Sequence, residues 1–184
     1  MNDKCGMVDD VVAQLGYGRG PNDRCGIRGH VIAELFGPDG KLKQREETHN
    51  LVTDIGDIYF AKRAYSTESL ATFYMKTASD NVIAAKSGSG SYIVSNYNEH
   101  SVAAMVTNWP AAGATNNVAQ FKSTWAADAD HAYTVRRVAL TINSDNNADE
   151  AAADCYAMSV FSADIVKTAA DTLTITWNIT FTGA

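Results

Sequence analysis

The end of the chain carries the clearest alternation of apolar and polar residues. From 173 to 181 every odd position is apolar, and from 172 to 182 every even position is threonine or asparagine. A period of two over this length is typical of a β-strand with one buried face. A slip of one residue would expose Trp177 and Phe181, so the register should be well specified. We expect this strand to complete a sheet built by earlier segments.

Residues 30–48 have the pattern of a β-hairpin. Apolar residues alternate from 31 to 35, the letters GPDG follow at 37–40, and a polar, charged segment returns over 41–48. Proline presets φ at the second position of a turn, and glycine tolerates a positive φ. A strand with so many charges suits a sheet edge or a solvent-exposed face.

Residues 51–65 are the clearest helix, because their apolar side chains recur at intervals of three and four. Thr53 or Asn50 can cap the start of this helix. Acidic residues occupy its first turn and basic residues its last, as the helix dipole favours. Gly56 interrupts the pattern and could mark close packing against a sheet.

The middle of the chain alternates between strand-like segments and loops. Seven or eight strands would fit the length, so the sequence predicts a mainly β protein: an antiparallel β-sandwich or jelly-roll-like fold with one helix at its side. The segment 102–106 could be either strand or helix. Strand-like segments occupy 70–76, 92–94, 102–106, 134–142 and 156–161, and loops are predicted at 88–90, 111–113 and 144–154.

The first 29 residues differ from the rest and hold six of the 13 glycines. Glycine disfavours regular structure, so we interpret residues 1–29 as an extended arm and residues 30–184 as the β-sandwich domain. A disordered tail is the alternative. A short apolar pattern over 8–15 could form a helical turn or two, and apolar residues in an arm favour docking on a partner. The expected interface residues are Met7, Val11, Val12, Leu15, Tyr17 and Ile27.

Composition narrows the class of protein. The chain has 184 residues, 46% of them hydrophobic, which is enough for one domain with a substantial core. The net charge of −6 disfavours nucleic-acid binding, which normally needs a basic surplus. No apolar run approaches the roughly 20 residues that span a bilayer, and the N-terminus lacks the pattern of a signal peptide. We therefore expect a protein made in a cytoplasm that binds neither nucleic acid nor membrane.

Candidate metal ligands are few and widely spaced. The three cysteines, Cys5, Cys25 and Cys155, do not form the pattern of a disulfide framework, so reduced thiols are expected. A zinc site would have to combine the first two cysteines with His30 and His49, but the short ligand spacings of structural zinc sites do not occur. Ordinary thiols and surface histidines are the simpler interpretation, and we predict no metal site.

The sequence lacks the common catalytic motifs. It contains no phosphate-binding loop, no dinucleotide-binding glycine motif, no HExxH and no GxSxG. The acidic segment 145–150 lacks the glycine and the spacing of a calcium loop. Glu46 and Glu47 are adjacent on a strand and should point to opposite faces, and the four histidines are scattered. We therefore predict no catalytic residue and no cofactor, while Trp109 and Trp125 could each anchor an interface or lie at the core edge.

Three segments carry a more specific pattern, and a fourth matches it more faintly. Residues 29–41 combine GHV with the turn GPDGK, residues 48–56 read THNLVTDIG, and residues 166–181 end in DTLTITWNITF. The fainter match is at residues 117–121. In these segments the chain resembles a recurrent family of tailed-bacteriophage virion proteins. The resemblance covers roughly residues 29–56 and 166–181, and it implies a structural role, because these motifs describe strands and turns rather than a reactive site.

The resemblance implies a non-enzymatic virion protein assembled in the host cytoplasm. As a capsid decoration or cement protein it would bind the major capsid protein and copies of itself, as a homotrimer, and stabilise the shell. The arm could cross a neighbour, since 29 extended residues reach on the order of 90 Å. One alternative is a tail-fibre, baseplate or receptor-binding component whose loops 86–91, 111–117 and 143–154 contact a glycan. A glycan hydrolase is a further alternative, but it lacks recognisable paired acids.

Overall fold

The computed structural model describes residues 26–65, 71–79, 81, 86, 102–104, 111–113, 115, 117–128, 132–144 and 154–182. Within these residues the chain forms nine strands and one helix. The predicted mainly β fold with a single helix is therefore confirmed. The elements are β1 (Gly26–Phe36), β2 (Leu42–Val52), α1 (Asp54–Tyr65), β3 (Tyr74–Ala78), β4 (Val102–Ala104), β5 (Ala111–Ala112), β6 (Val118–Trp125), β7 (Tyr133–Thr141), β8 (Cys155–Lys167) and β9 (Thr172–Thr182).

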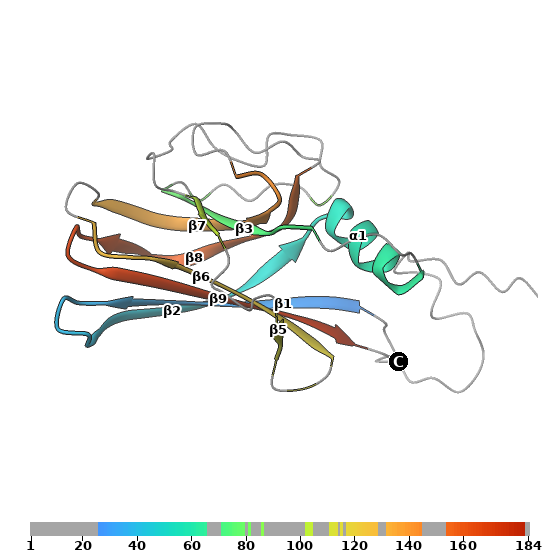
Figure 1. Cartoon of the computed structure of the whole chain (residues 1–184), viewed down its shortest axis with the longest axis horizontal. Helices are drawn as coiled ribbons and strands as arrows, with labels where there is room; N and C mark the ends of the chain where they lie inside the picture. Colours follow the sequence, from blue (N-terminus) through green and yellow to red (C-terminus); the bar gives the residue numbers. More distant parts are fainter. Residues whose placement is uncertain are drawn as a thin grey trace, which may run out of the picture.

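The strands form one strongly curved sheet that folds over into two layers. Their order is β4-β3-β7-β8-β2-β1-β9-β6-β5, and all of the pairings are antiparallel. The layer of β3, β7 and β8 lies above the layer of β2, β1, β9 and β6, and α1 projects from one end (Figure 1). On the side away from β8, Ser123 Oγ of β6 donates a hydrogen bond of 3.3 Å to the Ala103 carbonyl of β4. The sheet is therefore nearly closed, which matches the predicted sandwich.

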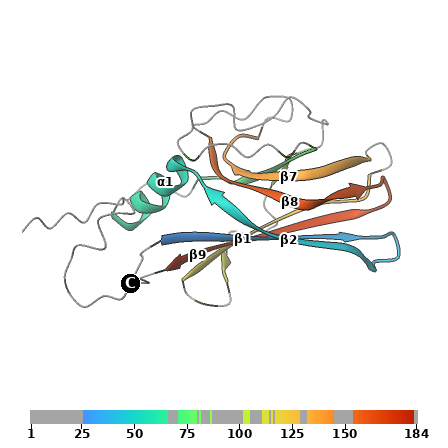
Figure 2. The same ribbon diagram turned by 180° about the vertical axis from the view of Figure 1, so that it is seen from behind.

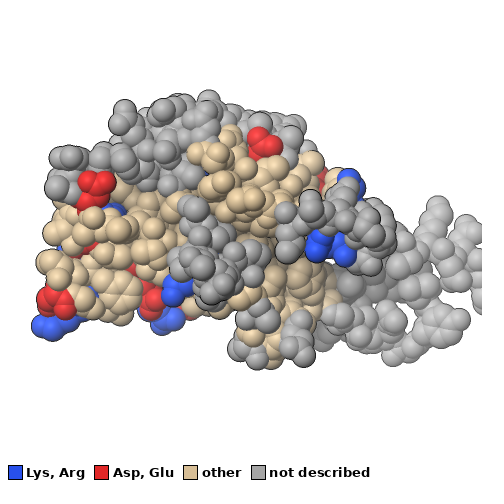
Figure 3. All heavy atoms as spheres, in the orientation of Figure 1, with Lys and Arg blue, Asp and Glu red and all other residues tan. Residues whose placement is uncertain are grey.

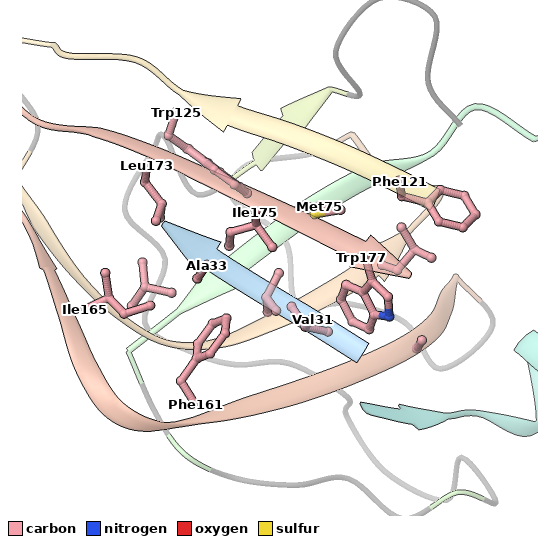
Figure 4. Close-up of a cluster of buried hydrophobic side chains, with 14 of the residues drawn as sticks. Val31, Ala33, Met75, Phe121, Trp125, Phe161, Ile165, Leu173, Ile175 and Trp177 are labelled. Carbon is pink, nitrogen blue, oxygen red and sulfur yellow. The ribbon is translucent and has the colours of Figure 1, made fainter. Parts of the chain in front are cut away.

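The terminal strand lies inside its layer rather than at an edge. β9 pairs with β1 along its whole length and with β6 on the other side. Its odd residues from 173 to 179 are fully buried, whereas its threonines face outward, as the alternation predicted. Trp177 of β9 lies beside Val31 of β1, and Phe161 of β8 belongs to the same core cluster (Figure 4). Trp125 is also buried, so it belongs to the core.

The predicted hairpin and turn are present. β1 and β2 pair from Gly29 with Asn50 up to Phe36 with Leu42. Gly40 has a φ of 75°, the left-handed conformation that favours glycine in a turn. The Lys41 amide donates to the Asp39 carboxylate at 3.1 Å, which closes the turn. The sequence therefore determines this part of the fold locally.

The helix begins three residues later than predicted, because β2 continues into that segment. Leu51 pairs across to β8, and α1 starts at Asp54. Thr53 is the cap, since its Oγ1 accepts a hydrogen bond of 3.0 Å from the Gly56 amide. A Cβ at Gly56 would collide with the carbonyl oxygen of Tyr156 on β8. This glycine therefore permits the close helix–sheet packing that its position in the pattern suggested.

Several predicted boundaries need correction. β1 begins at Gly26, so residues 26–29 belong to the sheet and not to the arm. Ile27 therefore lies in β1 and not in the arm. It is half-buried opposite Phe181 against the core, and its role at an interface stays a prediction. The segment 111–113, predicted as a loop, contains β5, because two of its residues pair with β6. Met7, Val11, Val12, Leu15, Tyr17 and Trp109, the segments 88–90 and 92–94, and most of 144–154 lie outside the described residues.

Candidate functional surface

The outward side of β2, β1, β9 and β6 carries a continuous set of mostly polar side chains. These side chains alternate with the core residues of the same strands, so the register places them on one common face. We call this surface the polar face. It comprises Arg45, Glu47 and His49 of β2, His30, Ile32 and Glu34 of β1, Thr174, Thr176 and Asn178 of β9, and Gln120, Lys122 and Thr124 of β6.

Charged side chains on the β1 and β2 part of the polar face form a connected series of ion pairs. Arg45 Nη2 lies 2.7 Å from Glu47 Oε1, and Arg45 Nε lies 3.6 Å from Glu34 Oε1. The second oxygen of Glu47 lies 3.0 Å from Nε2 of His30. The ring of His30 is 5.6 Å from that of His49, its partner in the register. Figure 3 shows acidic and basic side chains interspersed at the end of the molecule that carries the hairpin turn.

The other half of the polar face is uncharged except for Lys122. Gln120 Nε2 donates to Asn178 Oδ1 at 2.6 Å, and the hydroxyls of Thr124 and Thr174 are 3.2 Å apart. Cross-strand polar pairs of this kind stabilise a sheet by a few tenths to about 1 kcal/mol each. These pairs therefore link β6 to β9 on the outward side of the sheet.

Side chains rather than backbone close most of the junction between β2 and β8, which we call the seam. The backbones of these strands pair only near Leu51 and Val52. Beyond that point, Thr48 Oγ1 donates to the Val160 carbonyl at 2.9 Å, and Gln44 Nε2 donates to the Asp164 carbonyl at 3.0 Å. The charged strand is thus partly an edge, as predicted, and its polar side chains cover the neighbouring carbonyls. Figure 2 shows β2 rising from the lower layer towards β8.

A buried carboxylate holds the turn between β8 and β9. Asp171 is fully buried and accepts from Lys43 Nζ at 2.9 and 3.0 Å, from the Thr168 amide at 3.0 Å and from the Thr168 hydroxyl at 2.7 Å. Burial opposes ionisation, but these hydrogen bonds prevail and lower the pKa of Asp171 to about 2. Burial also lowers the pKa of Lys167, whose ammonium lies 5.6 Å from the ring centre of Tyr133. The contacts of Asp171 therefore stabilise the turn between β8 and β9.

The structure separates some sequence candidates and joins others. Glu46 accepts from Ser162 at the seam, whereas Glu47 lies on the polar face, so the predicted opposite orientation is confirmed. His30 and His49 are neighbours, although they are 19 positions apart. The predicted hairpin could have indicated this contact, because the two residues are almost equally distant from the centre of the turn. Cys5, Cys25, His100, His131 and residues 145–150 lie outside the described residues.

In the part of the chain that the structure describes, no three or more histidine, cysteine, aspartate or glutamate side chains are already arranged to hold a metal ion. The one helix among the described residues is too short to cross a membrane. Comparison of the chain with protein-family models, curated proteins and solved structures found no match.

Proposed function

We propose that the protein is a non-enzymatic structural component of a tailed-phage virion, a capsid decoration or cement protein that stabilises the shell as an oligomer. The proposal rests on the position of the segments that carry the resemblance. Residues 29–56 and 166–181, which carry the resemblance, form one connected unit of β1, β2, β9 and the start of α1. Such a connected unit would serve as a scaffold.

The contacts of individual motif residues support this interpretation. Thr53 caps α1 and Asp171 holds Lys43, so both residues act on the fold. Asn50 lies so close to its partner Gly29 that a side chain at Gly29 would overlap it. The motif thus encodes turns, a cap and a strand register, which is what a rigid building block needs.

The polar face also fits a structural role better than a reactive one. Its carboxylates, Glu34 and Glu47, are engaged by Arg45 and His30, which stabilises a surface instead of activating a nucleophile. The partners we propose are copies of the same chain, as a homotrimer, and the major capsid protein. Because β1 starts at the end of the sandwich opposite the hairpin turn, residues 1–25 would leave the domain there and cross a neighbour.

The copy number of the chain in purified particles tests the proposal. A decoration protein should be present at a number close to that of the major capsid protein, measured by quantitative mass spectrometry of intact virions. A handful of copies per particle would contradict the capsid location and indicate a tail or baseplate component. Absence from particles would overturn the virion role.

A variant without residues 1–25 tests whether the arm contributes to particle binding. We expect this variant to fold but to bind particles at least about tenfold more weakly, because apolar contacts of the arm must offset the entropy of ordering it. Light scattering after gel filtration measures whether the full chain and the shortened chain form trimers. Undiminished particle binding would contradict the proposed clamp.

A further inference from the structure

Two histidines face each other on the exposed surface of the hairpin. His30 of β1 and His49 of β2 are direct partners in the register, and both point outward from the sheet. Their ring centres are 5.6 Å apart and their planes are inclined by 42°. Opposite residues of an antiparallel pair have Cβ atoms only about 5 Å apart. The backbone register therefore places the two imidazoles within reach of each other.

This separation is close to what a shared metal ion needs. Imidazole nitrogens bind zinc at about 2.0–2.1 Å, so two rings on one tetrahedral ion have centres about 5 Å apart. The observed distance of 5.6 Å between the ring centres is near this value. Both ligands would stand on adjacent strands of a sheet, a rigid platform that limits the ordering cost of binding.

A carboxylate lies beside the pair. Glu47 Oε2 is 3.0 Å from His30 Nε2, near the roughly 3.4 Å that separates two ligand atoms on a tetrahedral ion. Arg45 holds the other oxygen of Glu47 at 2.7 Å and so keeps Oε2 directed at His30. The side chains of His30 and Glu47 are 37% and 42% exposed, so an ion can reach them from solvent.

We propose that His30, His49 and Glu47 form a binding site for a divalent transition-metal ion of the zinc type. Two imidazoles and one carboxylate favour zinc, nickel or copper over magnesium or calcium, which prefer oxygen ligands. As the described side chains stand, no three histidine, cysteine, aspartate or glutamate residues could hold a metal ion together, so binding requires the His49 ring to turn toward the other two ligands. A fourth position stays open to water or to a ligand from a second molecule.

Titration calorimetry with Zn²⁺ tests the site on the full chain with Cys5 and Cys25 replaced by serine, which removes competing thiols. We expect one ion per chain, and binding at least about tenfold weaker in His30→Ala and in His49→Ala, as loss of a ligand implies. Thr174→Ala, which changes the same face away from the three ligands, is the matched control and should bind normally. Thermal unfolding should shift upward with Zn²⁺ in the control and not in the histidine variants.

Equal Zn²⁺ affinity in the control and both histidine variants would overturn the proposal, and so would no binding at millimolar Zn²⁺. His30→Asn and His49→Gln, which keep a polar side chain, serve as second variants if an alanine variant fails to fold, and circular dichroism monitors that. Glu47→Gln should weaken binding less than either histidine change, because the two imidazoles supply most of the affinity. The site does not depend on the virion role, which particle copy number tests separately.

Discussion

Individual side chains fix the turns of this sandwich, and Asp171 is the clearest case. Its carboxylate lies between Lys43 of β2 and Thr168 of the preceding turn, and it has no exposure to solvent. An anion in such a place is tolerated because several donors satisfy both of its oxygens. The same residue also opens the DTLTITW segment, so one side chain links the turn to the hairpin.

Asp171→Asn is expected to destabilise the protein by about 1–3 kcal/mol, because it weakens hydrogen bonds made to a buried charge. Urea unfolding measures this loss. Asp39→Asn is the matched control, since Asp39 pairs with Lys41 on the surface and its removal should change stability little. Equal effects of the two substitutions would contradict the role assigned to Asp171.

The pKa of Asp171 sets the pH dependence of this contribution. The folded pKa is about 2 and the ordinary value is 3.8. A depressed carboxyl pKa stabilises the folded state fully above the ordinary value, and the stabilisation is lost as pH falls from about 4 towards 2. Between these pH values the wild type should therefore lose stability more steeply than Asp171→Asn, which urea unfolding at a series of pH values would show.

The need for glycine at position 56 comes from close contact with β8, a strand that is distant in the sequence. Alanine is about 1 kcal/mol better than glycine in a helix, yet Gly56→Ala should destabilise by about 1–3 kcal/mol, because its Cβ would meet the backbone of Tyr156. Thermal unfolding would measure the change. Ile58→Ala, at a position of α1 that is 48% exposed, should have a much smaller effect. Stabilisation by Gly56→Ala would show that the helix can move away from β8.

At the scale of elements, the seam between β2 and β8 is where the two layers meet by side-chain contacts. A strand edge exposes unpaired backbone groups, and charged or bulky side chains commonly protect it. Here Gln44 and Thr48 cover carbonyls of β8 directly, and Ser162 reaches Glu46. The polar side chains of β2 that face β8 thus protect a partial edge, whereas its charged residues Arg45 and Glu47 lie on the polar face.

Thr48→Val should lower stability by about 1 kcal/mol, because valine keeps the shape but leaves the Val160 carbonyl without its hydroxyl donor. Thr176→Val on the polar face is the control and should be nearly neutral. Hydrogen exchange of β8 amides, compared between the two variants, locates the effect. Faster exchange confined to β9 would contradict the assignment of the seam.

At the scale of the whole molecule, stability depends on non-local pairing. β9 is inserted between β1 and β6, and it supplies four fully buried residues to the common core. Deleting residues 172–184 should therefore abolish cooperative unfolding. Deleting residues 1–25 should preserve it, because β1 begins at Gly26. Circular dichroism during heating distinguishes the two variants, and cooperative unfolding of the first would contradict the central role of β9.

Local patterns predicted the hairpin, the helix and β9, because turn chemistry and periodicity act over a few residues. They did not predict that Leu51 extends β2, since that depends on pairing with Met158 more than a hundred positions away. The partnership of Lys43 with Asp171 depends on the same kind of long-range placement. The His30–His49 contact is intermediate: the hairpin register implies it, but only once the strands are known to pair.

The first and last described residues of the sandwich lie side by side, with Thr182 Oγ1 bonded to the Gly26 carbonyl at 2.8 Å. A tensile load pulling these two ends apart would act across the rungs of β1 and β9 one at a time, in an unzipping geometry. Peeling of this kind resists much less force than shearing a whole ladder at once. Mechanical strain transmitted through the leading segment would thus be released by stepwise detachment of β1 before the opposite turn is disturbed.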